Sequence, residues 1–281
     1  MSSTAFTQET ELFPGKRDDF EIRNGNHLVR LARDWREVEA AMALRYRIFY
    51  EEMQARPTAE MAMRKQDFDR YDEVADHLLV LDEKIGDGPE AVVGTYRLIK
   101  RDAVARCGAF YSAAEYDLGI LTSIPDEILE LGRSCVDLEY RNRRVINLLW
   151  QGIAHYCVKY DIRLMFGCAS LPGKNKDAHA LPLSYLYHNH LAPVPIRPKA
   201  LPERHVDMNL LSPTEIVEKD AVKMVPPLIK GYLRIGGFVG DGAVIDEQFN
   251  TTDVCIVVKT KLITSKYARH FERQGFNLRS I

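Results

Sequence analysis

The stretch from residue 130 to residue 144 holds the residue types best suited to chemistry in this chain. Glu130 and Arg133 lie three positions apart in an alternating apolar segment, which predicts a strand over 130–138. A carboxylate beside an amine can act as a general base, because the amine must lose its proton before it attacks. Residues three apart in a strand face opposite sides, so the two can share a cleft only at a backbone irregularity such as a bulge at Gly132. An exposed ion pair is the simpler alternative.

A cluster of arginines follows at the predicted start of a helix over 145–160. Its members are Arg141, Arg143 and Arg144. A helix start presents backbone N–H groups and the positive end of the helix dipole, and arginines add charge-assisted hydrogen bonds. A solvated basic turn is the alternative, but the preceding strand favours an anion site. The arrangement therefore predicts group transfer from a donor with a phosphorylated handle.

An acidic segment lies inside a predicted loop over 54–76 and contains Asp67, Asp69 and Asp72. Its spacing lacks the glycine and the final glutamate of a calcium-binding EF-hand loop. Binding of a cationic substrate and a solvated acidic face are the two interpretations left open. His188 and His190 have no third ligand at a suitable spacing, so no metal site is predicted.

The overall composition excludes several classes of protein. A net charge of −2 argues against a general nucleic-acid binder, which is usually basic. The five cysteines are scattered without a C-x-x-C pair, which favours buried thiols in a reducing cytoplasm. We find no signal peptide and no apolar run long enough to span a bilayer, so we expect a soluble or peripheral protein. Six Lys/Arg against one Glu from Lys259 onward predict a solvated face, or contact with an acidic partner or an anionic membrane.

The pattern of apolar residues predicts an α/β protein after an N-terminal tail over 1–24. Asp34 can cap a helix that begins at Trp35. The other predicted elements are a helix over 228–235 and strands over 27–33, 77–81, 91–99, 162–168 and 253–258. A proline-rich insertion occupies about 171–213, and a basic helical tail follows the last strand. We therefore expect one domain over 25–281.

Four short motifs, in order along the chain, resemble those of the GNAT acyltransferase superfamily. They are Arg45-Tyr-Arg47-Ile-Phe49, Asp67-Phe68-Asp69, Arg97-Leu98, and Glu130 with Arg133. More closely, the chain resembles the bacterial ornithine-lipid synthases, which are L-ornithine N-acyltransferases, and it shares this pattern with acyl-homoserine-lactone synthases. The segments 149–154, 166–170, 226–234 and 246–253 are similar to the ornithine-lipid group, so the resemblance covers about residues 27–273.

The resemblance implies a single GNAT-like α/β domain with a mixed central sheet flanked by helices. It implies transfer of a 3-hydroxyacyl group to the α-amino group of L-ornithine, which forms lyso-ornithine lipid in the first step of ornithine-lipid biosynthesis. The donor would be an acyl carrier protein that carries the thioester on 4'-phosphopantetheine. The implied partners are this carrier protein, L-ornithine and the anionic inner-membrane surface, with no nucleic acid, no bound cofactor and no metal. The protein would be cytoplasmic or peripheral at that membrane.

The resemblance also implies roles for individual residues. Glu130 is the expected base and Arg133 the second catalytic residue. Arg133 and Arg97 would contact the substrate carboxylate or pair with the acidic loop, whose aspartates would attract the cationic side chain. A backbone N–H in the strand after Arg133 would stabilise the oxyanion. The expected substrate-binding residues are Arg47, Phe49, Asp67, Asp69, Asp72, Arg97, Ser134, Cys135 and Val136, and the expected donor-binding residues are Arg141, Arg143 and Arg144.

The start of the predicted helix departs from the pattern of the coenzyme A-dependent members. Those members carry R/Q-x-x-G-x-G/A, whereas this chain has Arg141-Asn-Arg-Arg144-Val-Ile146, with larger residues at both glycine positions. The loss of close backbone approach favours an acyl carrier protein over free coenzyme A as donor. Three alternatives stay open: acylation of another amino acid such as glutamine or lysine, homoserine-lactone synthesis from S-adenosylmethionine, and non-enzymatic lipid binding on a GNAT-like scaffold.

Overall fold

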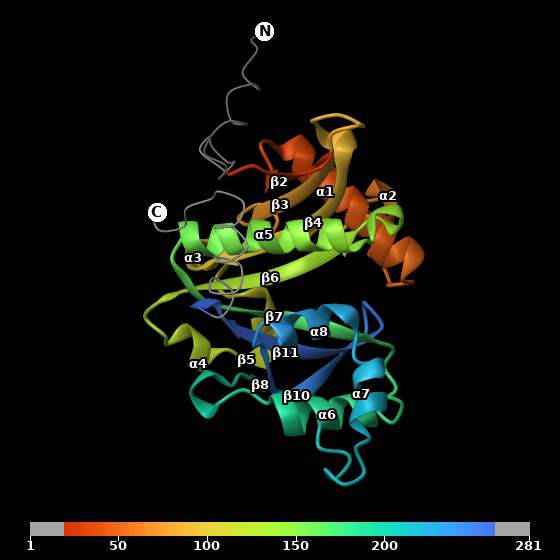
Figure 1. Ribbon diagram of the computed structural model, residues 1–281, viewed down its shortest axis with the longest axis vertical. Helices are drawn as coiled ribbons and strands as arrows, with labels where there is room; N and C mark the ends of the chain where they lie inside the picture. The colour runs from red at the N-terminus through yellow and green to blue at the C-terminus, as the bar shows by residue number, and fades with distance from the viewer. Residues whose placement is uncertain (1–19, 262–281) are drawn as a thin grey trace. The chain divides into compact units, whose positions relative to one another are not determined.

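The computed structural model describes residues 20–261 of the 281-residue chain. Its elements, labelled in Figure 1, group into two compact units. Of the described residues, the first unit holds 20–53, 57–108 and 132–155. The second holds 54–56, 109–131 and 156–261. The predicted basic tail lies outside the described residues from residue 262 onward.

The strands of the first unit follow the order β1-β2-β3-β4-β6, and the first four pair antiparallel with their neighbours. Their bounds are β1 (Ile22–Asn24), β2 (His27–Leu31), β3 (Asp76–Asp82) and β4 (Val92–Lys100), with the second half of β6 (Glu127–Val136). The strands predicted over 27–33, 77–81 and 91–99 are thus confirmed. Strand β1 forms from the last residues of the predicted N-terminal tail.

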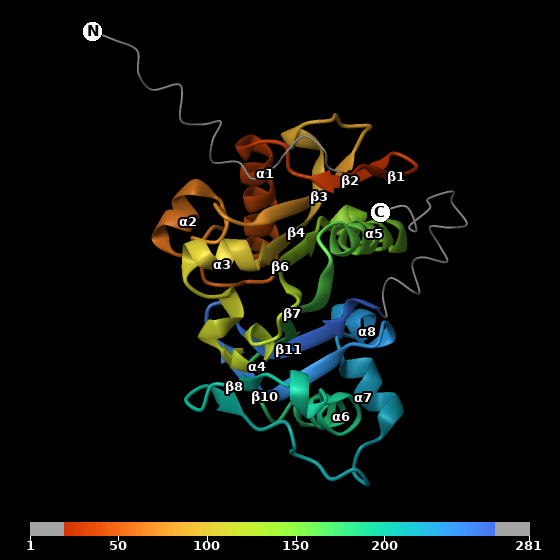
Figure 2. The same cartoon turned by 90° about the vertical axis from the view of Figure 1, so that its left-hand side faces the viewer.

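Strand β3 is buried on both faces, so its alternate side chains pack against two helices. Leu79 and Leu81 join the apolar side chains of α1 (Trp35–Tyr46) in one core cluster. Leu78 points the other way, toward Gly152 of α5 (Arg143–Lys159), where an added Cβ would lie 3.0 Å from its methyl groups. Figure 2 shows α1 and α5 on opposite sides of these strands. The first unit is therefore a three-layer arrangement with the sheet in the middle.

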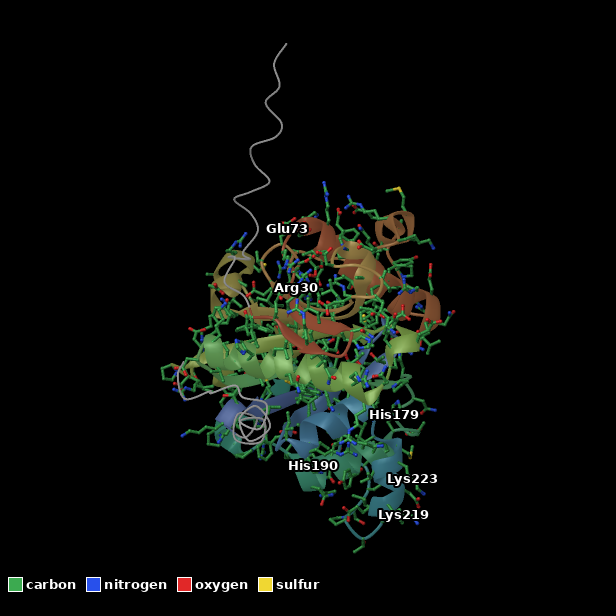
Figure 3. The ribbon with its side chains drawn as sticks, turned by 45° about the horizontal axis from the view of Figure 1, so that its top comes forward. Arg30, Glu73, His179, His190, Lys219 and Lys223 are labelled. Carbon is green, nitrogen blue, oxygen red and sulfur yellow. The ribbon has the colours of Figure 1, made fainter. Side chains whose placement is uncertain are left out.

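Helix α1 begins where the sequence predicts, because the Asp34 side chain accepts the Glu37 N–H at 3.0 Å. Glu37 in turn accepts two hydrogen bonds of 2.6 Å from Arg30, a β2 side chain that is 2% exposed. Arg30 is labelled among the side chains in Figure 3. This buried pair ties the first helix to the sheet.

The chain after α1 winds as a π-helix, η1 (Arg47–Glu52), in which the Met53 N–H bonds to the Ile48 carbonyl five residues back. Such windings are frequent at functional sites. A short helix, α2 (Ala59–Arg64), follows within the segment predicted as a loop, so the prediction of a loop is wrong there. Thr58 caps this helix by accepting the Met61 N–H. The first unit also contains η2 (Pro89–Ala91), α3 (Arg101–Cys107) and η4 (Leu138–Tyr140).

The strands of the second unit follow the order β6-β7-β11-β10-β8-β5, with β9 on β10. Parallel pairs join β6 to β7 and β8 to β10, and the other pairs are antiparallel. The bounds are β5 (Tyr116–Asp117), β7 (Ile162–Pro172), β8 (Lys199–Ala200), β9 (His205–Val206), β10 (Phe238–Asp246) and β11 (Thr251–Lys259). The strands predicted over 162–168 and 253–258 are confirmed as parts of β7 and β11, whereas β10 was not predicted. The mixed pairing confirms the predicted α/β class.

The helices of the second unit cover its strands. Helix α8 (Pro227–Arg234) packs on β7 and β11 and confirms the predicted helix, while α6 (Ala180–His190) packs on β10 and against α7 (Glu218–Met224). The predicted insertion over 171–213 thus contains a helix and strands that extend the sheet. The remaining elements are η3 (Tyr111–Ala114), α4 (Gly119–Thr122) and η5 (Val194–Ile196). Between residues 20 and 261, every helix is too short or too polar to cross a membrane.

Candidate active site

Three arginines and three aspartates form a closed set of ion pairs inside the first unit. We call this set the arginine–aspartate network; its members are Arg45, Asp67, Asp69, Asp72, Arg97 and Arg133. Arg45 is fully buried, and its guanidinium lies 2.9 Å from Asp67 Oδ2 and 2.8 Å from Asp72 Oδ1. A buried charge is tolerated only when it is paired in this way.

Arg97 and Arg133 complete the network from two different strands. Arg97 Nη1 lies 2.7 Å from Asp69 Oδ1 and 3.2 Å from Asp72 Oδ1. Arg133 reaches Asp67 Oδ2 at 3.0 Å and Asp69 Oδ2 at 3.2 Å. Each of the three aspartates thus has an arginine counterion, and Asp67 and Asp72 are buried, so the acidic loop is not a solvated face. The network brings together five residues predicted from sequence, namely Asp67, Asp69, Asp72, Arg97 and Arg133. Arg47 and Glu130 lie outside it, and Arg45 takes part although only its motif was singled out. The substrate-binding roles assigned to these residues stay predictions.

The electrostatics of the network keep two of its aspartates, Asp67 and Asp72, charged. Burial raises the pKa of Asp67, but the Arg133 and Arg45 charges outweigh burial and leave the pKa below its usual value. The pKa of Asp72 is lowered in the same way by Arg45 and Arg97. The His77 Nε2–H group donates to the Asp72 carbonyl, 3.0 Å away, and the burial of His77 lowers its imidazole pKa to about 4. A neutral histidine therefore lies beside the charged Asp72 of the network.

The backbone irregularity expected between Glu130 and Arg133 lies at Arg133 itself. Arg133 has a φ of 51°, in the left-handed region that a non-glycine residue rarely adopts. Such a residue interrupts the alternation of strand side chains, so the simple rule of opposite faces does not hold across it. The strained conformation is held by the two ion pairs that Arg133 makes with Asp67 and Asp69.

Glu130 lies at the end of the pairing of β6 with β7 and is 2% exposed. Its carboxylate accepts the N–H groups of Tyr111 and Ser112, each at 2.7 Å, and also the Ser112 hydroxyl. Both carboxylate oxygens thereby hold the turn η3. Gly167 follows Phe166, the β7 residue that pairs with Glu130. A Cβ on Gly167 would lie 2.1 Å from the Leu131 carbonyl oxygen, so only glycine allows β7 to approach β6 there.

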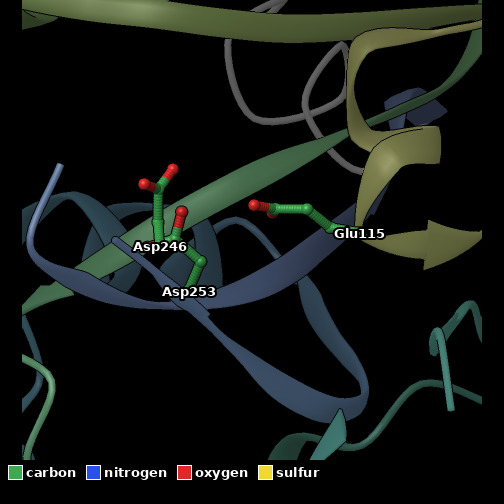
Figure 4. Close-up of side chains that lie close together, drawn as sticks. All are labelled: Glu115, Asp246 and Asp253. Carbon is green, nitrogen blue, oxygen red and sulfur yellow. The ribbon is translucent and has the colours of Figure 1, made fainter. Parts of the chain in front are cut away.

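The turn held by Glu130 leads directly into a second group of acidic residues. We call Glu115, Asp246 and Asp253 the carboxylate cluster; one oxygen from each lies within 4.8 Å of the others. Figure 4 shows the Glu115 side chain extending toward Asp253, with Asp246 beside it. Cys168 links the cluster to the turn, because its sulfur lies 3.1 Å from Glu115 and 3.4 Å from the Ser112 hydroxyl. Burial raises the pKa of the Cys168 thiol well above its usual value, so the thiol is a proton donor here.

The carboxylate cluster was not predicted from sequence, since its members are distant along the chain. The sequence shows only that the segment 246–253 is similar to the ornithine-lipid synthases. Asp253 is buried, which together with Glu115 raises its pKa to about 7, although the Thr251 and Ser170 hydroxyls act in the opposite direction. The Oδ1 atom of Asp246 accepts hydrogen bonds from the N–H groups of Gln248 and Phe249 in the β10–β11 turn. The cluster is therefore a site of concentrated negative charge.

Comparisons with known proteins identify the family of this chain. Residues 44–151 match the acetyltransferase (GNAT) domain family. Over 252 residues the chain is 47% identical to the L-ornithine N(alpha)-acyltransferase of Agrobacterium fabrum, covering 89% of this chain and 86% of that protein. The protein of the same name from Rhizobium meliloti is 48% identical over 252 residues, covering 89% and 85%. The chain belongs to the L-ornithine N(alpha)-acyltransferase family. Among solved structures, the AHL synthase LasI covers 83% of this chain and 90% of its own, at 12% identity and a TM-score of 0.46.

The arginines predicted to bind the donor of this acyltransferase lie around the start of α5. Arg141 is paired with Glu52 and donates to the Val136 carbonyl at 2.9 Å. Arg143 and Arg144 are exposed at the first two helical positions. The backbone N–H groups there are largely occupied, because the Asn142 side chain accepts from Arg144 and Val145 at 3.0 and 3.2 Å. Two of the N–H groups expected to meet a phosphate thus already have a partner, while the anion-binding role of Arg141, Arg143 and Arg144 stays a prediction.

The remaining residues predicted to bind the substrate belong to the first unit. Arg47 pairs with Asp137, and the Phe49 side chain packs against the core beside α1. Ser134, Cys135 and Val136 form the end of β6, where they carry the N–H groups expected to face the oxyanion. Burial raises the pKa of Cys135 to about 12, so a thiolate nucleophile is not available near neutral pH.

Proposed function

We propose that this acyltransferase moves a 3-hydroxyacyl group from the thioester of an acyl carrier protein to the α-amino group of L-ornithine, forming lyso-ornithine lipid. The observation that carries the proposal is the identity of 47% over 89% of the chain to an L-ornithine N(alpha)-acyltransferase. In the reaction, a C–N bond forms as the C–S bond breaks. The released thiol stays on the phosphopantetheine of the carrier, and the amine loses a proton.

Direct attack of the amine fits the chemistry of the candidate site better than an acyl-enzyme. Cys135 on β6 is held as a thiol, and Cys168 in the second unit is held as a thiol as well. A thiol is a weak nucleophile, so neither side chain is prepared to accept the acyl group. The N–H groups along Ser134–Val136 are our candidates for stabilising the tetrahedral oxyanion.

The role of Glu130 separates into two possibilities with different consequences. As a base, it would take the proton of the α-ammonium group. As a positioning residue, it would act by holding the Tyr111 and Ser112 N–H groups and the turn that leads to Glu115. Its three hydrogen bonds, which favour the charged carboxylate, support the second role. We expect Glu130→Gln to lower kcat/KM by about a hundredfold or more.

The pH dependence of that loss distinguishes the two roles. If Glu130 is the base, the deficit shrinks at high pH, where the free amine is already neutral. If it is a positioning residue, the deficit is the same at every pH. Glu127→Gln, at the exposed start of the same strand, is the matched control and should retain full activity.

The donor side of the proposal rests on the exposed arginines at the start of α5. An acyl carrier protein is acidic, so Arg143 and Arg144 would attract it electrostatically. We expect the double variant Arg143→Gln/Arg144→Gln to raise KM for the acyl carrier protein by about tenfold at low salt, and the difference to shrink at high salt. Contact with an anionic inner membrane is a further proposal, supported by the basic residues after Lys259 in the sequence.

Mass spectrometry of the product tests the proposed function directly. The full chain is incubated with 3-hydroxyacyl carrier protein and, in parallel, with ornithine, lysine, glutamine or S-adenosylmethionine. We expect an N-acylated ornithine as the main product. Acylation only in the presence of S-adenosylmethionine would identify a homoserine-lactone synthase instead. If cells that express the Glu130→Gln variant made as much aminolipid as cells with the unaltered protein, a non-enzymatic binding protein would be favoured.

A further inference from the structure

The carboxylate cluster carries negative charge that its surroundings do not cancel. Among the described residues, its cationic neighbour is Arg204, which lies 3.4 Å from Glu115 and is about one-third exposed, at 33%. Arg204 also donates to the carbonyls of Ala114 and Ile245, so its guanidinium is shared among three acceptors. Arg204 therefore offers the three carboxylates only part of its charge. A buried concentration of this kind is costly unless a cation joins it.

An unpartnered oxygen indicates where such a cation would bind. Asp253 is 6% exposed, and its Oδ1 has no hydrogen-bond partner in the part of the chain that the structure describes. The Asp253 carboxyl group points into the space that Glu115 and Asp246 also face (Figure 4). A buried acceptor without a donor is rare in folded proteins and calls for a ligand that donates.

We propose that the carboxylate cluster binds the side-chain ammonium group of the acyl acceptor and thereby selects α-amino acids with a cationic side chain. The inference rests on the proposed function and names the residues that would choose ornithine among amino acids. It also replaces Asp67, Asp69 and Asp72 as the cation-binding residues, because the arginines of the network already neutralise those three.

The geometry of the cluster fits an alkylammonium group. Such a group has three N–H donors in a tetrahedral arrangement. Charge-assisted hydrogen bonds of about 2.8 Å from one nitrogen place their acceptors roughly 4.6 Å apart. The three cluster oxygens lie within 4.8 Å of one another.

A metal ion fits the cluster less well. Calcium prefers about six to eight oxygen ligands, and magnesium demands near-ideal octahedral geometry. Here one Asp246 oxygen is already occupied by two backbone N–H groups, and the guanidinium of Arg204 would lie close to a divalent ion. Repulsion between Arg204 and a dication would weaken metal binding more than the binding of a single positive charge.

The bound ammonium group would be the one that does not react. Three carboxylates stabilise the charged form of an amine and raise its pKa, whereas the attacking amine must be neutral. The cluster therefore suits the δ-ammonium of ornithine, which stays charged throughout the reaction. Glu130 would support this selection indirectly, because its hydrogen bonds fix the turn that ends beside Glu115.

Substrate competition between ornithine and norvaline tests the inference, because norvaline has the same carbon side chain without the terminal amine. We compare kcat/KM of the full chain and of Asp253→Asn, at pH values above the Asp253 pKa of about 7. The variant should lose about ten- to a hundredfold on ornithine, mainly through KM, since one charge-assisted hydrogen bond is lost. Its activity on norvaline should stay unchanged. Equal losses on both substrates, or none on ornithine, would overturn the inference.

Two further variants protect the test against trivial causes. Asp246→Asn keeps an oxygen for the turn N–H groups while removing the charge, and should show the same selective loss. Glu247→Gln lies in the same turn, is paired with Lys174 outside the cluster, and should behave like the unaltered protein. Thermal unfolding of each variant checks that the fold is retained.

A binding measurement separates this inference from the proposed function. Calorimetric titration with ornithine, without any acyl donor, should show affinity weakened about tenfold or more by Asp253→Asn and unchanged by Glu247→Gln. If ornithine binds in this way but is never acylated, the proposed function fails and the cluster assignment stands. If ornithine is acylated but Asp253→Asn and Glu247→Gln both bind it as tightly as the unaltered protein, the cluster assignment fails and the proposed function stands. Stabilisation by calcium or magnesium that Asp253→Asn abolishes would identify a metal site and also overturn it.

Discussion

In the arginine–aspartate network of the first unit, three guanidinium groups meet three carboxylates, and each aspartate has at least one arginine partner. In the carboxylate cluster of the second unit, three carboxylates meet one guanidinium within the described residues, and one buried oxygen has no partner. Both sets are largely buried and both come from segments that are distant in sequence. They differ in charge balance, and that difference changes what each can do.

A balanced network stabilises a conformation, because every charge already has its counterion and little is gained from adding a ligand. Arg133, with its left-handed backbone, is held in place by such pairs. An unbalanced cluster costs stability in the absence of a ligand and gains it when a cation binds. Functional sites often accept a stability cost of this kind.

The largest expected effect is on the balanced side. Arg45→Met should lower the free energy of unfolding by about 3–5 kcal/mol, because it leaves the buried Asp67 and Asp72 without their shared partner. Urea denaturation measures this value. Arg33→Met, which breaks an exposed pair with Glu21, is the control and should cost less than about 1 kcal/mol. Similar losses in both variants would mean that the network is not the structural element described above.

The pH dependence of stability should have opposite signs in the two regions. The pKa of Asp253 in the folded protein is raised from 3.8 to about 7. The contribution of its protonated form to the free energy of unfolding is therefore fully present below pH 3.8 and is lost as the pH rises to about 7. The change is at most about 1.4 kcal/mol per pH unit for one proton. Asp253→Asn should therefore be more stable than the unaltered protein near pH 8, with a difference that vanishes near pH 4. A constant difference across this range would contradict the raised pKa.

His77 should show the reverse behaviour in the balanced region. The pKa of His77 in the folded protein is lowered from 6.5 to about 4. The contribution of neutral His77 to the free energy of unfolding is therefore fully present above pH 6.5 and is lost as the pH falls toward 4. In His77→Gln that loss should disappear, which makes the variant's unfolding free energy flatter between these pH values. Urea unfolding at each pH measures it. A His77→Gln curve parallel to that of the unaltered protein would show that the histidine is not neutral in the folded state.

The smallest expected effect concerns the counterion of the unbalanced cluster. Arg204→Gln removes the charge that competes with a bound cation for Glu115. We expect KM for ornithine to fall by about two- to threefold, and stability to change by less than about 1 kcal/mol because Arg204 is partly exposed. Steady-state kinetics and urea unfolding supply the two values. A higher KM would mean that Arg204 contacts the substrate rather than competing with it.

The sequence predicted the elements whose signals are local. Helix α5, the β3–β4 hairpin and the Asp34 cap follow from periodicity, a turn sequence and one side chain. Strand β10 was missed because Gly240 and Gly242 interrupt its apolar pattern. Gly242 has a φ of 84°, and the register shifts between Val239 and Ala243. An irregular strand of this kind is defined by its partners rather than by its own residues.

The candidate site was predictable to the extent that it lies in short motifs. Asp67, Asp69, Arg97 and Arg133 belong to the predicted pattern, and the structure joins them through ion pairs. Arg47 and Glu130 belong to the same pattern but have other partners, Asp137 and the turn at Tyr111. Charge cancellation within the network depends on three-dimensional pairing, which spacing does not reveal. The carboxylate cluster combines one residue after a short turn with two from a hairpin far along the chain, so no window of sequence contains it.

The two units exchange the chain several times: β6 begins in the second unit and ends in the first, and α5 begins in the first and ends in the second. This interleaving sets an order for folding during synthesis, which proceeds from the N-terminus. The first unit has all its segments once residue 155 has left the ribosome, whereas the early part of β6 must wait for β7. A ribosome paused between these points would carry a completed arginine–aspartate network and an unformed carboxylate cluster, so the scaffold can form before the specificity site exists.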